Sequence, residues 1–84
     1  MKENKLYELM DDDSTSCGII DTNAPMGVVS TIWKKVYNGE LNDTDKEGIR
    51  KYDAWDMSYC DWVIAILKHR MYDAHKLETI EIYS

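Results

Sequence analysis

The sequence predicts a small α+β fold, a two-layer sandwich in which helices cover one face of a three-stranded, mainly antiparallel sheet. Three observations support this fold class. Two short apolar segments near the N-terminus flank a polar stretch, which is typical of a β-hairpin. Two segments in the middle of the chain repeat apolar residues at helical spacing. The last residues alternate between apolar and polar, as in a strand with one solvent-facing side.

The expected order is β-β-α-α-β, with a further short helix between the two long ones. The chain has 84 residues, so we expect one domain over residues 1–84. A chain of this length buries a smaller share of its surface than a larger protein does, and its core is therefore thin.

The segments KLYELM and CGIIDT form the expected hairpin, with a long loop of Asp, Ser and Thr residues between them. The alternation of side chains in a strand places Tyr7 and Leu9 on one face of the first strand. Cys17 and Ile19 are expected opposite them on the second strand.

The first helix is expected to follow a cap at Thr22 or Asn23, with Pro25 in the first turn, where its missing N–H is not needed. Apolar residues then recur at helical spacing: Val29, Ile32, Trp33 and Val36. Asn38 and Gly39 are a stop signal.

A capping box of Thr44 and Glu47 predicts the short helix, over about residues 45–52. A helix of about four turns is expected to follow a cap at Asp56. Its centre, WVIAIL, is also compatible with a buried strand, because it is short and rich in β-forming residues. The basic residues 68–70 favour the helix, since cations suit a helix C-terminus.

The final strand is expected in LETIEIY, residues 77–83, with Ile80 and Ile82 facing inward. His75 is then a loop residue in front of this strand. The sequence contains no internal repeat and no low-complexity segment, and nothing in it suggests a second domain.

Charge and composition favour a binding role over nucleic-acid contact or membrane insertion. The chain has 10 basic and 16 acidic residues and a formal charge of −6, whereas nucleic-acid binding needs clustered Lys and Arg. Six Tyr, three Trp and no Phe give every aromatic ring a polar group, which is typical of interfaces. No segment resembles a signal peptide or a membrane span, so a cytoplasmic protein is expected.

The stretch DDDSTSCG raises the question of a reactive cysteine. A nucleophilic thiol needs a nearby cation or a helix N-terminus, whereas Cys17 follows three aspartates. We therefore expect a half-buried strand cysteine, and free thiols at both Cys17 and Cys60 because no export signal is present. The sequence predicts no catalytic residue and no cofactor.

The segment DTDKEG, residues 43–48, resembles the first half of an EF-hand or dockerin calcium loop, in which acidic residues alternate before a glycine. The second half departs from that pattern, because Arg50 and Ala54 stand where a hydrophobic residue and a bidentate carboxylate belong. A capped, exposed turn is the simpler interpretation, and no metal ligand is assigned.

Tyr52, Trp55, Tyr59 and Trp62 recur at spacings of three, four and three, so on one continuous helix they would form a stripe. Most of this stripe is expected in the core. The alternative places Tyr52 and Trp55 on the surface as part of an interface.

The sequence therefore predicts a small, acidic, non-enzymatic protein-binding module. In size, acidity and Tyr and Trp usage it resembles the small accessory proteins of phages and mobile elements, which include anti-CRISPR inhibitors. That resemblance is one of general character and implies an inhibitor that occupies a basic, nucleic-acid-binding surface of a host protein. The alternative is a small-ligand or calcium-binding regulatory module. The residues expected to contact the partner are Asp11, Asp12, Asp13, Glu40, Asp43, Asp45, Glu47, Tyr52, Asp53, Trp55 and Asp56.

Overall fold

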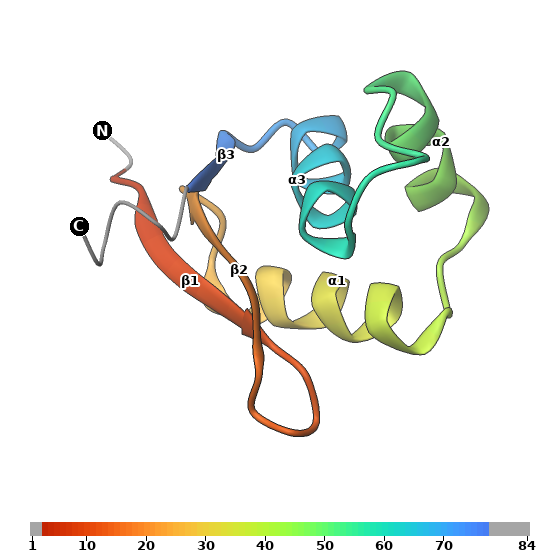
Figure 1. Cartoon of the computed structure of the whole chain (residues 1–84). Helices are drawn as coiled ribbons and strands as arrows, with labels where there is room; N and C mark the ends of the chain where they lie inside the picture. Colours follow the sequence, from red (N-terminus) through yellow and green to blue (C-terminus); the bar gives the residue numbers. More distant parts are fainter. Residues whose placement is uncertain (1–2, 78–84) are drawn as a thin grey trace.

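The computed structural model describes residues 3–77. Its elements follow in the order β1 (Lys5–Met10), β2 (Ser16–Thr22), α1 (Met26–Asn38), α2 (Asp43–Lys51), α3 (Tyr59–His69) and β3 (Ala74–Leu77). The three strands form one antiparallel sheet in the order β1-β2-β3, and the helices lie on one side of it (Figure 1). The predicted α+β class and the three-stranded antiparallel sheet are confirmed.

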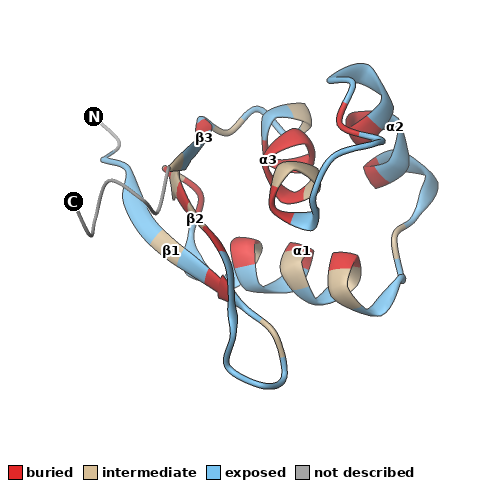
Figure 2. Ribbon diagram, in the orientation of Figure 1, coloured by how far each residue is buried: buried red, intermediate tan, exposed pale blue. Residues whose placement is uncertain are grey.

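Helix α3 lies at the centre of the molecule, in contact with β2, β3, α1 and α2. Its buried residues (Figure 2) come from more than one side of the helix: Cys60, Val63, Ile64, Ala65, Ile66 and Leu67. A helix that is apolar over most of its circumference must be covered on several sides. Because α3 contains the whole segment WVIAIL, that segment is helical, and the alternative of a buried strand is wrong.

The hairpin is confirmed, but its register differs from the expected one. Leu9 pairs with Gly18 and Tyr7 with Ile20, because the register shifts at a bulge between Leu9 and Met10. One extra residue on one strand moves every later side chain to the other face. Cys17 is consequently exposed rather than half-buried, whereas Ile20 is fully buried.

Gly18 occupies a position of β2 where a side chain would not fit. Its φ is +152°, and a Cβ there would lie 2.8 Å from the Sγ atom of Cys60. Helix α3 thus packs directly on the backbone of β2, which brings the central helix close to the sheet.

The predicted caps of α1 and α3 are both wrong. Helix α1 begins after Pro25, and no side chain caps it; Thr22 instead accepts a hydrogen bond from the Ala24 N–H (3.1 Å) and donates to the Asp73 carbonyl (2.6 Å). Helix α3 is capped by Ser58 rather than Asp56. The predicted stop of α1 is confirmed, with Gly39 in the left-handed conformation at φ 70°.

Helix α2 is capped by Asn42, whose side chain accepts a hydrogen bond from the Asp45 N–H (2.8 Å), so the expected cap at Thr44 is wrong. The Asp45 side chain is only 1% exposed. Its Oδ1 accepts a hydrogen bond from Arg70 at 2.9 Å, and its Oδ2 lies 3.9 Å from the Lys35 ammonium. Asp45 therefore links α2 to α1 and to the residue that follows α3, and it is not the exposed acidic residue that was expected.

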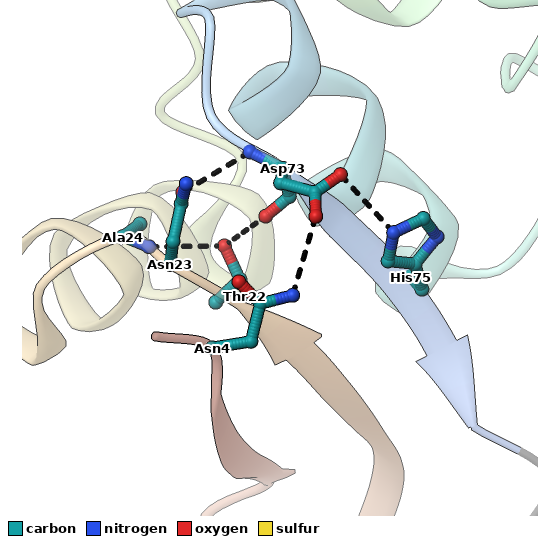
Figure 3. Close-up of polar contacts among 6 residues, drawn as sticks. All are labelled: Asn4, Thr22, Asn23, Ala24, Asp73 and His75. Atoms are coloured by element: carbon teal, nitrogen blue, oxygen red, sulfur yellow. Dashed lines mark hydrogen bonds and ion pairs between the residues drawn. The ribbon is translucent and has the colours of Figure 1, made fainter. Parts of the chain in front are cut away.

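Strand β3 begins earlier than predicted and includes His75, which was expected in a loop. The predicted strand over residues 77–83 lies, apart from Leu77, outside the described residues. A polar network fixes the start of β3 (Figure 3): the Asp73 carboxylate accepts a hydrogen bond from Asn4 (3.2 Å) and lies 3.1 Å from His75 Nε2. The Asp73 N–H donates to the Asn23 side chain at 3.1 Å, so the network joins the N-terminal segment, the β2–α1 connection and β3.

We expect Asp45→Asn to lower the free energy of unfolding by about 2 kcal/mol, because it leaves Arg70 and Lys35 facing a neutral amide. The estimate is below that for a fully buried pair, since the two cations are 35% and 32% exposed. Urea denaturation followed by circular dichroism measures the change.

Asp43→Asn is the matched control, because Asp43 is exposed in the first turn of the same helix. This substitution should lower the free energy of unfolding by about 0.5 kcal/mol or less, chiefly because a favourable interaction with the helix dipole is lost. Equal losses for the two variants would contradict a stabilising role for the buried carboxylate.

Candidate protein-binding surface

Five aromatic side chains are in ring-to-ring contact across α1, α3 and the connection that precedes α3. We call this set the aromatic row; in spatial order its members are Tyr37, Trp33, Tyr59, Trp62 and Trp55. The ring centroids of successive members are 5.6, 6.5, 5.3 and 5.8 Å apart. At such distances aromatic pairs attract each other and restrict each other's motion.

The aromatic row reaches the surface. Trp55 is 51% and Tyr59 46% exposed, whereas Trp33, Tyr37 and Trp62 are half-buried. The largest fully buried side chains are aliphatic, with Ile, Leu and Val leading. The expectation that most of the aromatic stripe lies in the core is therefore wrong, and the expected alternative, an exposed Tyr52 and Trp55, describes the geometry.

The predicted stripe also does not lie on one helix, because α2 ends at Lys51 and α3 begins at Tyr59. The turns between α2 and α3 bring Trp55 into contact with Trp62, and the two indoles stack with an interplanar angle of 18°. Tyr52 stands apart from the aromatic row, with the ammonium of Lys68 6.0 Å from the centre of its ring.

The hairpin tip closes on the Tyr37 end of the aromatic row. The Asp12 N–H donates to the Tyr37 hydroxyl oxygen at 3.5 Å, and the Trp33 indole N–H donates to the Met10 carbonyl at 2.9 Å. These contacts border a groove of about 310 Å³, lined by Met10, Asp12, Trp33, Lys34, Tyr37 and Asn38. A carboxylate, two aromatic rings and one lysine thus share a single hollow.

At the other end of the aromatic row, two exposed carboxylates flank Trp55 in the chain. Asp53 adopts a left-handed conformation with φ 52°, and Asp56 lies in the turn that leads to α3. Both side chains are exposed. Carboxylates therefore stand near each end of a row of aromatic rings.

The three aspartates of the hairpin tip do not have the same role. Asp11 is half-buried, and its Oδ1 accepts hydrogen bonds from the N–H groups of Asp13 (2.9 Å) and Thr15 (2.8 Å). This is the local turn that aspartate favours. Asp12 and Asp13 are exposed, so they supply the accessible charge of the tip.

The second predicted acidic cluster is smaller than expected. Glu40, Asp43 and Glu47 are exposed, but Asp45 is buried. Glu47 lies 3.7 Å from Arg50, which offsets part of its charge. Asp12 of the hairpin tip shares a groove with Trp33 and Tyr37, and the exposed Asp56 is adjacent to Trp55 in the chain.

Residues 43–48 form the first turns of α2 rather than a loop that could wrap around a cation. Helical geometry sends Asp43 and Asp45 to different sides, and the carboxylate of Asp45 faces Arg70 and Lys35. Among residues 3–77, no group of three or more His, Cys, Asp or Glu side chains is placed to hold a metal ion.

The two cysteines are free and lie in different environments. Cys17 is exposed in β2, and Cys60 is buried in α3. Burial is the main cause that raises the pKa of the Cys60 thiol to about 11, with Lys76 opposing it. A thiol of this kind stays protonated and unreactive at neutral pH.

Sequence reasoning missed Trp33 and Tyr37 as surface residues. Their spacing of four places them on one side of α1, but that spacing alone does not tell a core face from an exposed one. The contact that decides it is with the hairpin tip, through Met10 and Asp12.

No family model, curated protein or solved structure matches this chain. Within the described part of the chain, none of the helices is long and apolar enough to span a membrane. The candidate site therefore rests on the residues and their geometry alone.

We expect one thiol of the folded protein to react rapidly with Ellman's reagent at pH 8 and two to react after unfolding in guanidinium. Cys17 is accessible, whereas Cys60 is buried and its thiolate is disfavoured. Cys17→Ser should abolish the rapid phase. Two rapid thiols in the folded protein would show that β2 does not cover Cys60 as the structure has it.

We expect millimolar calcium to leave the melting temperature unchanged within about 1 °C, because a ligand stabilises a protein only when it binds the folded state. Differential scanning fluorimetry with and without chelator measures this. A rise of several degrees that Asp43→Asn abolishes would reinstate a calcium site in residues 43–48.

Proposed function

We propose that this protein is a non-enzymatic protein-binding module that inhibits a host protein by occupying a basic, nucleic-acid-binding surface. The observation that carries the proposal is the aromatic row with carboxylates near both ends. Exposed Trp and Tyr side chains are the residues that most often anchor protein interfaces. The acidic groups beside them favour a basic partner.

The net charge of the chain and its general resemblance to phage and mobile-element proteins support the choice of target. The formal charge of −6 over 84 residues attracts basic surfaces over a distance set by ionic strength. The general resemblance to phage and mobile-element proteins, anti-CRISPR inhibitors among them, favours a host nuclease or repressor as the partner. Such a partner places the protein in the cytoplasm of the host cell.

A small-ligand or calcium-binding role has less support. The segment that resembled a calcium loop is helical, and its most central carboxylate is engaged by two cations of the same chain. Asp73 and His75 lie together, but Asp73 is already engaged through its backbone. Its carbonyl accepts a hydrogen bond from Thr22 and its N–H donates to Asn23, and these bonds hold the start of β3 in place.

The proposal is tested by photocrosslinking in a host-cell lysate, with benzoylphenylalanine introduced at Trp55 in one variant and at Met71 in another. Met71 is 91% exposed and is not part of the aromatic row, so it reports non-specific capture. A nucleic-acid-binding protein captured only through position 55 supports the proposal. Equal capture at both positions, or capture of proteins without a basic surface, would contradict it.

With the captured protein as partner, Asp12→Asn combined with Asp56→Asn should slow association about threefold or more at low salt. Exposed charges act mainly on the association rate through long-range attraction. Glu3→Gln combined with Asp43→Asn removes the same charge from exposed positions in front of β1 and in the first turn of α2 and is the control. Surface plasmon resonance at several salt concentrations separates the two rates, and an equal effect of both double variants would rule out a local role for the carboxylates beside the aromatic row.

A further inference from the structure

We infer that the aromatic row binds an extended, arginine-rich segment of the partner protein. This inference rests on the proposed function and adds the chemistry of the bound segment. Three features favour arginine over other occupants: the aromatic rings, the positions of the carboxylates, and the inaccessibility of two of the three indole N–H groups.

The ring faces offer a surface that a guanidinium group can stack on. An arginine side chain is planar and weakly hydrated, and it packs on Trp and Tyr faces through cation–π and stacking contacts. Four successive ring contacts of 5.3 to 6.5 Å place five rings in one row, and Trp55 and Tyr59 are its most exposed members. An extended segment can place alternate side chains along that row.

Carboxylates near both ends of the aromatic row can pair with cationic side chains of the segment. Asp12 borders the groove that Trp33 and Tyr37 line, and the exposed Asp53 and Asp56 lie within two residues of Trp55 in the chain. A guanidinium can stack on a ring and donate two hydrogen bonds to a carboxylate at the same time. An ammonium is a compact, strongly hydrated charge and gains less from the rings.

Two of the three indole N–H groups of the aromatic row, which a proline-rich segment would use as donors, are not accessible. The Trp33 indole N–H already donates to the Met10 carbonyl at 2.9 Å. The Trp62 indole N–H is buried and has no partner among the described residues. Of the indole groups, only that of Trp55 is left to donate to a bound chain, which makes the row less suited to a series of backbone carbonyls than to a cation.

Lys34 provides a test in which the expected direction of the change in affinity is known. Its exposed side chain lines the same groove as Asp12, and there it repels an incoming arginine. Lys34→Glu should therefore strengthen binding of an arginine-rich segment. Lys46→Glu makes the same charge change at an exposed position of α2, outside the groove, and controls for the net charge.

The experiment measures binding of three synthetic peptides to the full chain by isothermal titration calorimetry and tryptophan fluorescence at 150 mM salt. One peptide alternates Arg with Gly, the second carries Lys in place of Arg, and the third is rich in Pro. We expect the arginine peptide to bind about fivefold tighter than the lysine peptide, because only the guanidinium stacks on the rings.

Two variants then locate the site. Trp55→Leu should lower the affinity for the arginine peptide about fivefold, since it removes the most exposed ring of the aromatic row. It should also reduce the difference in affinity between the arginine and lysine peptides. Lys34→Glu should tighten binding about threefold, while Lys46→Glu changes it less because of screening. Unchanged circular dichroism and melting temperature confirm that the variants are folded.

Equal affinity for the arginine and lysine peptides, tighter binding of the proline-rich peptide, or no heat and no fluorescence change at millimolar peptide would each overturn the inference. These outcomes leave the photocrosslinking test of the proposed function unaffected, because a basic partner can present a folded surface rather than an extended segment. Failure of crosslinking at position 55 would instead remove the proposed function itself.

Discussion

Helix α3 can be stable only when other elements cover it, because six of its 11 residues are buried and they are distributed around the helix. The sheet covers one side through β2 and β3, while α1 and α2 cover others. The close approach of Cys60 to the backbone at Gly18 fixes how near the helix can lie to the sheet. The remaining elements take their places around this helix, and α2 is held there additionally by the contact of Asp45 with Arg70.

This arrangement fills the interior with aliphatic side chains and leaves the large aromatic residues at its margin. Ile20, Ile32, Ile49 and Ile66 are fully buried, and branched residues of this size pack well between closely spaced elements. The rings of Trp33, Trp62 and their neighbours then pack against one another at the edge of the core. The same constraint that gives the molecule a dense core therefore gives its surface the aromatic row.

The sequence allowed much of the fold to be predicted, because periodicity and stop signals are local. The hairpin, the stop at Gly39 and the helix over WVIAIL followed from patterns that neighbouring residues set. The hairpin register was missed, since one bulge residue, invisible in the alternation, reverses the faces. The caps of α2 and α3 were each missed by two residues because Asn42 and Ser58 compete with equally suitable neighbours.

The candidate site was harder to predict, since it depends on contacts between segments that are distant in the chain. The charge pattern marked Asp45 as one member of an exposed acidic cluster, and only the positions of Lys35 and Arg70 explain its burial. In the same way, Tyr37 gained its place in the aromatic row through the hairpin tip. Exposure of Trp55 was considered from its polar neighbours, but its stacking on Trp62 depends on how the chain turns between α2 and α3.

The pairing of β2 with β3 has a consequence for how the chain folds. The Thr22 hydroxyl and the Asp73 carbonyl that mark this pairing are 51 residues apart in the chain, whereas the hairpin of β1 and β2 is local. Distant pairings close slowly because the loop entropy is lost before the contacts form. The sheet is therefore expected to be completed late, after the three helices have brought β3 to β2. Until then β2 has an unpaired edge, which makes that strand the place where a nascent or truncated chain can associate with other chains.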